Sequence, residues 1–252
     1  MRLSDSIKIK RDDKMNNDIQ ILKEMIKNSK NIVFFGGAGV STESGIPDFR
    51  SKDGLYNQQY KYPPETILSH TFFMNKTEEF FKFYKLKMNS LKYQPNITHI
   101  KLSELEARGK LKAVITQNID GLHQKAGSKV VYELHGSVLR NYCMNCHKFY
   151  DAEYVFNSNG IPRCSCGGII KPDVVLYEEG LDEETIKKSI YAIQNADLLI
   201  VAGTSLTVQP ASGLINFFRG RNLVLINRDS TPYDNKANLV INDSLGKVFS
   251  NL

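Results

Sequence analysis

The sequence predicts an α/β protein: a parallel sheet covered by helices on both faces, with a small cysteine-bearing module and a helical segment inserted into it. Three observations support this. Short apolar runs typical of buried strands alternate with amphipathic helical stretches. A glycine-rich turn follows the first apolar run, and all four cysteines lie between residues 143 and 166.

The first half of the chain begins with a helix over residues 16–28, where Ile19, Leu22, Met25 and Ile26 share one face. A buried strand follows over 31–35. The next stretch is irregular and aromatic-rich, and becomes helical over 77–91. A further helix is expected over 97–108, ending at Gly109, and a second buried strand over 111–116.

The second half continues the alternation. Acidic residues in the first turn favour a helix over 182–195. We expect strands over 197–203, 222–227 and 237–243, with a helical stretch near 210–219. The composition therefore suggests a polar tail over 1–14, a sheet domain over 15–58, 96–140 and 169–252, a helical segment over 59–95 and a cysteine module over 141–168.

Composition narrows the class of protein. Of 252 residues, 41% are hydrophobic and 24% charged, as in ordinary globular proteins. No apolar run approaches the roughly 20 residues of a membrane helix, and the first 14 residues lack the apolar core of a secretory signal. The net charge of +6 comes from scattered lysines, so nucleic acid is not an expected partner. Clustered cysteines favour a reducing compartment, the cytoplasm.

The glycine-rich turn carries Gly37, Ala38, Gly39 and Thr42. Its glycines match the first two of a dinucleotide-binding loop, in which the backbone approaches a pyrophosphate at a helix N-terminus. A plain strand-to-helix turn is the alternative. Thr42 replaces the third glycine, and the acidic residue of a Rossmann dehydrogenase is missing downstream. In its place stands SGIPDFRS, whose Arg50 suits phosphate oxygens.

Polar residues also follow the strand over 111–116. Gln117 and Asn118 can bond sugar hydroxyls, and Asp120 can accept bonds from an amide. His135 suits general-base chemistry near neutral pH. Histidines also stand at 70, 99, 123 and 147, and spacing alone does not choose among the five.

The cysteine spacing predicts a closed tetrahedral zinc site formed by Cys143, Cys146, Cys164 and Cys166. Four protein ligands leave no position for water, so the zinc-ribbon module is expected to be structural. Buried free cysteines are the alternative, and His147 is a less favoured substitute ligand.

Six motifs occur together in one order: GAGVSTESGIPDFRS, TQNIDGLHQKAG, ELHGS, the cysteine pairs, KPDVV and GTSLTVQPA. With them the chain resembles the sirtuin family of NAD-dependent protein-lysine deacylases, in a bacterial-type form, from about residue 16 to 249. The resemblance implies a Rossmann-like NAD-binding domain and a structural Zn²⁺. It also implies a transferase that moves an acyl group from protein lysine to ADP-ribose and releases nicotinamide, with NAD consumed as co-substrate.

The resemblance also implies site residues. Asn118 and His135 are catalytic, His135 as general base, and main-chain groups of Val174, Val175 and Leu176 pair with the acylated peptide. The implied cofactor-binding residues are Gly37, Ala38, Gly39, Thr42, Asp48, Phe49, Arg50, Gln117, Asn118, Ile119, Asp120, His135, Gly203, Thr204, Ser205, Asn227 and Arg228.

The resemblance also implies which residues contact each part of NAD. The glycine loop holds the pyrophosphate with Arg50 nearby, and Phe49 shields the nicotinamide. Residues 117–118 contact the nicotinamide ribose, and residues 119–120 form the carboxamide pocket. Residues 203–205 lie under the adenosine half, and residues 227–228 contact the adenine ribose.

The chain departs from the family pattern at Gly36, where threonine is frequent, and at Glu178, which replaces a glycine. Family members that favour acidic acyl groups carry a Tyr-x-x-Arg pair, and the similar pair in this chain is Tyr84 and Lys87. Lysine lacks the planar guanidinium fork of arginine, and this difference favours simple deacetylation. A protein mono-ADP-ribosyltransferase and a non-catalytic module binding NAD or ADP-ribose are the alternatives. His135 and KPDVV favour deacylation over ADP-ribosyl transfer, and the presence of His135, Asn118 and Asp120 together argues against a non-catalytic module.

Overall fold

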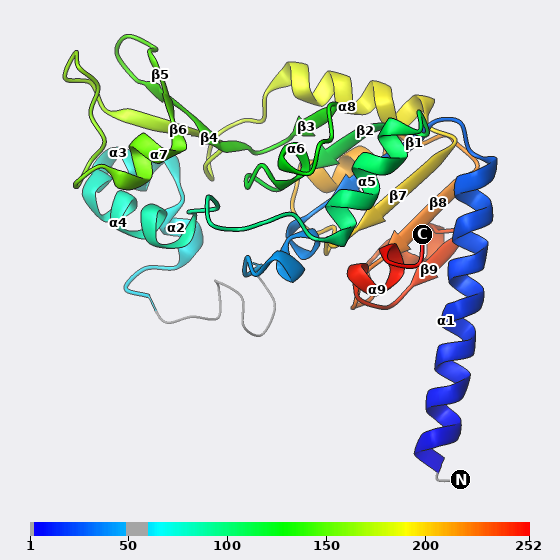
Figure 1. The fold of residues 1–252 in the computed structure, drawn as a ribbon. Coiled ribbons are helices and arrows are strands. Elements are labelled where there is room, and N and C mark those ends of the chain that lie inside the picture. The colour runs from blue at the N-terminus through cyan, green and yellow to red at the C-terminus, as the bar shows by residue number, and fades with distance from the viewer. Residues whose placement is uncertain (1–2, 49–59) are drawn as a thin grey trace.

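The computed structural model describes residues 3–48 and 60–252, with side chains from residue 13 onward. Six parallel strands form the main sheet in the order β3-β2-β1-β7-β8-β9 (Figure 1). The order reverses between β1 and β7, which places a topological switch point at their carboxyl ends. The strands of this sheet are β1 (Ile32–Gly36), β2 (Leu111–Thr116), β3 (Val131–Glu133), β7 (Leu198–Ala202), β8 (Asn222–Ile226) and β9 (Leu239–Ile241).

The central strands are apolar along their whole length because both faces of the sheet are covered. In β1, Ile32 and Phe34 point into one core, and Val33 and Phe35 into the other. All five residues of β1 are buried. Helices and 3₁₀ turns of the large domain are α1 (Leu3–Asn28), η1 (Ala38–Val40), η2 (Thr42–Ser44), α5 (Ile97–Ala107), α6 (Leu122–Lys125), α8 (Glu183–Asn195), η4 (Ala211–Phe217), η5 (Asp234–Lys236) and α9 (Leu245–Phe249).

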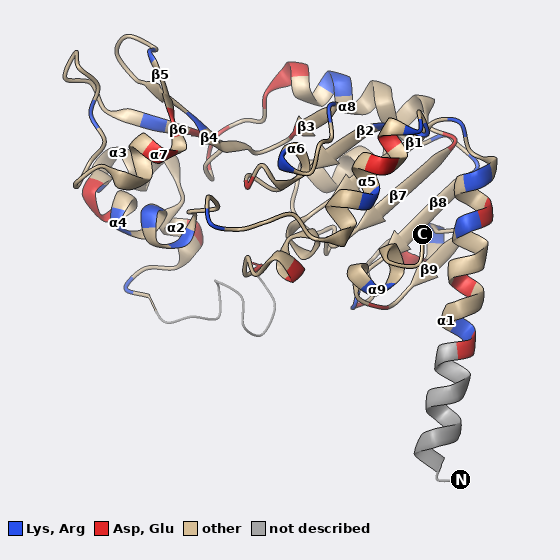
Figure 2. Ribbon diagram, in the orientation of Figure 1, with Lys and Arg blue, Asp and Glu red and all other residues tan. Residues whose placement is uncertain are grey.

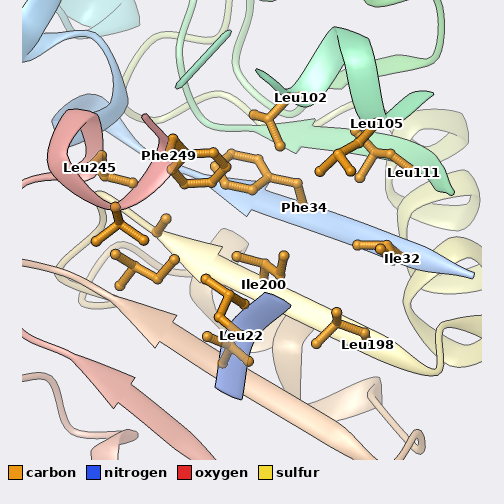
Figure 3. Packing of buried hydrophobic residues seen from close by; sticks show 14 of the residues in the cluster. Leu22, Ile32, Phe34, Leu102, Leu105, Leu111, Leu198, Ile200, Leu245 and Phe249 are labelled. Atoms are coloured by element: carbon orange, nitrogen blue, oxygen red, sulfur yellow. The ribbon is translucent and has the colours of Figure 1, made fainter. Parts of the chain in front are cut away.

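One face of the sheet packs against α1, α5 and α9. Leu22, Leu102 and Phe249 meet Phe34 and its neighbours there (Figure 3). The opposite face packs against α8 and η4, which contribute Ile193 and Leu214. The helix expected over 16–28 is therefore confirmed, with its predicted apolar face against the sheet.

A second, smaller domain surrounds a three-stranded antiparallel sheet with the order β5-β4-β6. Its elements are α2 (Pro64–Ile67), α3 (His70–Asn75), α4 (Thr77–Lys87), β4 (Gly136–Cys143), β5 (Phe149–Asp151), α7 (Ala152–Asn157) and β6 (Ile170–Val174). Phe80 and Phe81 of α4 share one core with Val155 and Ile170. The helical segment and the cysteine module therefore fold as one unit.

Most expected elements are present within a residue or two, but four differ. The helix expected over 77–91 ends at Lys87. The sheet contains β3, a sixth strand that was not expected because its three residues are only half-buried. The stretch near 210–219 is a 3₁₀ helix. The segment expected as a polar tail is helical from Leu3, and no proline or glycine precedes Asn28 to interrupt it.

β4 crosses the proposed domain boundary between residues 140 and 141, and the boundaries themselves stay predictions. Figure 2 shows lysines and arginines interspersed with acidic residues over both domains. Among residues 3–48 and 60–252, no helix has both the length and the apolar character needed to cross a bilayer.

Candidate active site

The glycine loop after β1 packs directly against the turn after β7. Gly39 N–H donates to the Gly203 carbonyl at 2.8 Å. A Cβ at Gly39 would lie 2.8 Å from Gly203 Cα, and a Cβ at Gly203, whose φ is 61°, would lie 2.5 Å from Val40 N. Only glycine allows this backbone approach. The loop thus sits at the switch point, where such sheets bind nucleotides.

Side chains join the ends of β2, β7 and β8, across the end of β1, which lies between β2 and β7. Gln117, just beyond β2, donates through Nε2 to Thr204 Oγ1 at 3.1 Å. Thr204 N–H, just beyond β7, donates to Asn227 Oδ1 at 2.9 Å. Asn227 directly follows β8. The residues expected near the ribose and adenosine parts of NAD therefore form one hydrogen-bonded row.

Ser41 connects the glycine loop to the segment after β2. Its hydroxyl accepts a hydrogen bond from Asn118 Nδ2 at 3.0 Å and donates one to Asp120 Oδ2 at 2.6 Å. Leu122 N–H donates to the other carboxylate oxygen at 2.9 Å. Both oxygens of Asp120 thus act as acceptors. Burial raises the pKa of Asp120, the bonds from Ser41 and Leu122 lower it, and the charge of Glu133 raises it.

His135 lies two residues after the end of β3 and is largely buried. Its Nδ1 lies 2.9 Å from the carbonyl oxygen of Gln117. Because a carbonyl oxygen only accepts, Nδ1 carries the proton and Nε2 keeps its lone pair in the neutral ring. Burial lowers the pKa of His135, while the bond to Gln117 raises it. The side chain is therefore a neutral base of fixed tautomer at pH 7.

The strand β6 is fixed beside this histidine. Val175 N–H donates to the His135 carbonyl at 3.0 Å. Gly136, with φ of 74°, permits the close contact of β4 with β6, since a Cβ there would lie 2.0 Å from the Asp173 carbonyl oxygen. Main-chain groups of the expected peptide-binding run thus begin next to the expected base.

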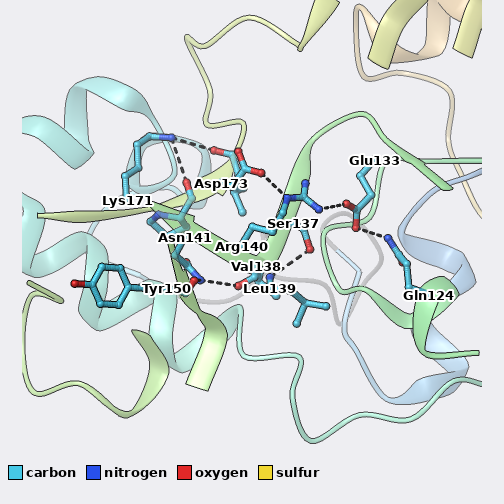
Figure 4. Close-up of polar contacts among 12 residues, drawn as sticks. Gln124, Glu133, Ser137, Val138, Leu139, Arg140, Asn141, Tyr150, Lys171 and Asp173 are labelled. Carbon is cyan, nitrogen blue, oxygen red and sulfur yellow. Dashed lines mark hydrogen bonds and ion pairs between the residues drawn. The ribbon is translucent and has the colours of Figure 1, made fainter. Parts of the chain in front are cut away.

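A salt-bridge network spans the two domains at the same place. Arg140 Nη1 donates to Glu133 at 2.6 Å, and its Nε donates to Asp173 at 2.7 Å. Gln124 Nε2 donates to the second Glu133 oxygen at 2.8 Å. Figure 4 shows Arg140 between the two carboxylates. The guanidinium therefore ties β3 of the large sheet to β6 of the small one.

The four cysteines converge as the spacing predicted. Their sulfur atoms all lie within 4.8 Å of one another, and the distances from Cys143 to Cys166 and from Cys146 to Cys164 are 3.5 Å. A tetrahedral Zn²⁺ with bonds of about 2.3 Å needs sulfur atoms about 3.8 Å apart. The donor set therefore fits zinc. His147 is exposed and lies outside this cluster.

Other expected residues have varied positions. Ala38, Thr42 and Asp48 lie on the described part of the glycine loop, whereas Phe49 and Arg50 fall outside the described residues. Ile119 packs against the small-domain core, and Arg228 is exposed. Ser205 Oγ lies 2.8 Å from Thr207 Oγ1.

Two residues correct the sequence interpretation. Tyr84 is fully buried between the rings of Phe80 and Phe156, so it is a core residue and contributes nothing to an acyl pocket. The sequence predicts no role for Ser41, although its hydroxyl contacts both Asn118 and Asp120 in the structure. Its signal in the sequence was only its position inside the glycine loop.

Comparisons with known proteins agree with this geometry. The Sir2 family model matches residues 37–210. An NAD-dependent protein deacetylase of Clostridium perfringens is 63% identical over 238 residues, which cover 93% of this chain and 98% of that protein. One of Cutibacterium acnes is 52% identical over 231 residues, covering 91% and 95%.

Solved structures match over the same extent. A Sir2 structure with a deacetylated p53 peptide and 3′-O-acetyl-ADP-ribose has a TM-score of 0.85 at 37% identity, covering 92% of this chain and 96% of that chain. One with a p53 peptide and NAD⁺ has a TM-score of 0.82 at 38% identity, covering 92% and 95%. With the matched model spanning more than half of the sequence and relatives of this identity, the chain belongs to the Sir2 family, as its six motifs predicted.

Proposed function

We infer that this protein is an NAD-dependent protein-lysine deacetylase, which transfers the acetyl group from lysine to ADP-ribose and releases nicotinamide. The observation that carries this function is the arrangement around His135. A neutral histidine of fixed tautomer stands beside the hydrogen-bonded set of Ser41, Asn118 and Asp120. Relatives named as NAD-dependent protein deacetylases and Sir2 structures holding a peptide with NAD⁺ or acetyl-ADP-ribose support it.

NAD is a substrate of this reaction. Its pyrophosphate is assigned to the loop of Gly37, Ala38, Gly39 and Thr42, which lies at the switch point of the sheet, where such folds bind nucleotides. The adenosine half is assigned to residues 203–205, with residues 227–228 at its ribose. Phe49 and Arg50 are assigned to the nicotinamide and phosphate ends, and those two roles, like that of Asp48, stay predictions.

The residues after β2 and His135 are assigned to the acyl-transfer reaction itself. Asn118 is held by Ser41, so its amide is oriented for the nicotinamide ribose, while Ile119 and Asp120 form the carboxamide pocket. The acyl oxygen of acetyl-lysine attacks C1′ of that ribose as nicotinamide leaves. His135 Nε2 then takes a proton from a ribose hydroxyl, whose oxygen attacks the former amide carbon. The bond between that carbon and the lysine nitrogen then breaks and releases free lysine. One water adds to the same carbon, whose bond to the C1′ oxygen breaks to leave 2′-O-acetyl-ADP-ribose.

The peptide is assigned to the main chain of Val174, Val175 and Leu176, to which it adds as an extended strand. The bond from Val175 N–H to the His135 carbonyl supports this, because it fixes the peptide-binding run beside the base. Main-chain pairing reads little side-chain identity, so loose sequence preference is expected. Lys87 Nζ lies over the ring of Tyr60 and Tyr84 is in the core, which supports simple deacetylation.

The four cysteines fit a structural zinc ion. When bound, it would crosslink β4 to the segment before β6 and supply folding energy but no catalytic position. Reduced, metal-binding cysteines support a cytoplasmic location, which we propose together with the function.

One experiment tests the function. Zinc-loaded protein is incubated with NAD and an acetyl-lysine peptide, and nicotinamide and O-acetyl-ADP-ribose are measured by mass spectrometry. Both products are expected in equal amounts, and His135→Ala is expected to bind NAD but lose turnover. Absence of nicotinamide would leave only an NAD-binding module. Attachment of ADP-ribose to protein without deacetylation would identify a mono-ADP-ribosyltransferase.

A further inference from the structure

The turn that follows β6 contains a glutamate where the backbone favours glycine. Glu179 N–H donates to the Leu176 carbonyl at 3.0 Å, which closes a four-residue turn. Glu178, its third residue, has φ of 75°. Type II turns require such a positive φ at this position and normally place glycine there. A glutamate is strained in this conformation because its Cβ crowds the following carbonyl group.

The side chain of Glu178 makes a contact that offsets this strain. Its Oε2 accepts a hydrogen bond from Thr71 N–H at 2.8 Å. Thr71 lies in the first turn of α3, whose N–H groups have no carbonyl partner within the helix. Ser69 Oγ takes the next of these donors, Phe72 N–H. The bonds to Thr71 lower the pKa of Glu178, so the carboxylate is charged.

The backbone connects the same two segments. Tyr177 N–H donates to the Leu68 carbonyl at 2.9 Å, and His70 N–H donates to the Tyr177 carbonyl at 3.0 Å. Residues 176–179 are thus joined to residues 68–71, and we name this pair of segments the clasp.

Glu179 has a different role within the clasp. Its Oε2 accepts from Leu176 N–H at 2.9 Å and from Lys171 Nζ at 3.1 Å, both on its own side. Its Oε1 lies 2.9 Å from His70 Nδ1. Glu179 therefore stabilises the turn through two bonds within residues 171–179 and contacts α3 only through His70. The carboxylate of Glu178 instead bonds the main chain of α3 at Thr71.

The clasp lies at the end of the run assigned to the peptide. We propose that Glu178 is a positioning residue for the acyl-peptide substrate: it holds the end of the 174–176 run against the N-terminus of α3. The inference rests on the proposed deacetylase function, because that function assigns the run to peptide binding. The strained backbone is retained since glycine at this position would leave Thr71 N–H without its carboxylate.

Three variants separate strain from contact. Glu178→Gly keeps the left-handed backbone without strain and removes the carboxylate, whereas Glu178→Ala keeps the strain without the contact. Glu178→Gln keeps an acceptor oxygen. The KM for an acetyl-lysine peptide is expected to rise about fivefold in Glu178→Gly and Glu178→Ala, and less than about twofold in Glu178→Gln. A fivefold change corresponds to the upper range of free energy for an exposed charged contact. The kcat and the KM for NAD should stay within about twofold.

Asp182→Gly is the matched control. Asp182 also caps a helix, accepting from Thr185 N–H of α8 at 2.7 Å, but lies outside the clasp. It should lower thermal stability and leave the peptide KM unchanged. The proposal is overturned if Glu178→Gly has the peptide KM of the unmodified protein, or if Asp182→Gly raises that KM equally.

A second readout does not depend on turnover. Amide hydrogen exchange followed by NMR should show faster exchange of Thr71 N–H in Glu178→Gly, while Leu176 N–H, bonded to Glu179, stays protected. Unchanged Thr71 exchange contradicts the proposal. If the unmodified protein does not deacetylate, the proposed function fails by itself. The role of Glu178 is then tested by the binding of a fluorescent acetyl-lysine peptide. Weaker binding to Glu178→Gly than to the unmodified protein supports the role, and equal binding overturns it.

Discussion

Ser41 and Asp120 lie 79 positions apart in the sequence, yet the hydroxyl of one donates to the carboxylate of the other at 2.6 Å. The same hydroxyl accepts from Asn118, so one small side chain orients two residues of the proposed NAD site. This contact joins the loop after β1 to the segment after β2, at the edge where the two parallel strands end.

Ser41→Ala should therefore impair the reaction while the fold persists. Losing a hydrogen bond to a charged group leaves Asp120 partly unsatisfied, and we expect kcat/KM for nicotinamide release to fall roughly 10- to 100-fold. Steady-state kinetics with varied NAD measures this. Ser103→Ala, which removes an exposed hydroxyl bonded only to Ile100, should have the kinetics of the unmodified protein. Equal kinetics in both variants would contradict the role of Ser41.

Arg140→Gln should shift the pH dependence of catalysis. The change removes the positive charge of Arg140 beside Glu133. The negative charge of Glu133 already raises the pKa of Asp120. The pKa of Asp120 should rise further, so the acid limb of the kcat/KM profile should move to higher pH. Arg108→Gln, which removes an exposed helix pair with Glu104, should not move the limb. An identical profile for both variants would refute this electrostatic role.

Gly203→Ala should damage both stability and NAD binding. Gly203 has φ of 61°, and a Cβ there would lie 2.5 Å from Val40 N, so the glycine loop must move. Gly109→Ala is the matched control, because Gly109 has φ of 70° and nothing within 4 Å of the added carbon. We expect a loss of about 1 kcal/mol from strain in the control and at least about twice that in Gly203→Ala. Urea unfolding and NAD titration compare them.

Removing zinc should unfold the small domain while the large sheet remains. Cys143 and Cys164 belong to the core shared with α4, so loss of the metal should loosen that core. Cys146→Ser or a strong chelator should abolish peptide binding, with circular dichroism showing partial loss of structure. One zinc per chain is expected by elemental analysis. His147→Asn should retain that zinc, and its loss there would show that the histidine is a ligand after all.

His99 and His123 should make the protein sensitive to mild acid. Both rings are buried, with centroids 4.7 Å apart, and burial lowers the pKa of His99 from 6.5 to about 4 and that of His123 in the same direction. As the pH falls, the histidines of the unfolded chain bind protons before those of the folded chain. The free energy of unfolding is therefore at its full value above pH 6.5 and decreases as the pH falls toward 4. For His99 the loss reaches about 3 kcal/mol.

His99→Gln separates this effect from the helix cap. His99 Nδ1 accepts from Asn96 N–H at the start of α5, and a glutamine can make the same bond. The variant should therefore be less destabilised between pH 6.5 and 4 than the unmodified protein. Free energies of unfolding from urea titrations across that range measure it; parallel curves would show that His99 does not titrate on unfolding.

Several structural features follow from local patterns. Apolar runs such as that of β1 became the central strands because five consecutive buried residues fit only a position covered on both faces. The helix face of Leu22, Met25 and Ile26 followed from its spacing. The cysteine spacing was sufficient to identify the four metal-ligand candidates, since each pair is close in sequence and the structure brings all four together. In each case the signal lies within one short window.

Other features depend on residues that are distant in the sequence. The half-buried strand β3 carries no periodic signal of its own and is defined by pairing with β2. Tyr84 resembles a substrate-contacting tyrosine in sequence but is stacked between Phe80 and Phe156. Glu178 departs from the family pattern, and nothing beside it in the sequence indicates that its carboxylate meets Thr71.

The sequence by itself determined the family, the alternation of strands and helices, the zinc ligands and the residue types of the site, because these are encoded in motifs and local periodicity. Only the tertiary structure decided which strand ends meet, which tautomer His135 adopts and which side chains orient the site residues. Those facts depend on contacts such as Ser41 with Asp120 and Gln117 with His135, and a contact between distant segments exists only once the sheet has brought their ends together.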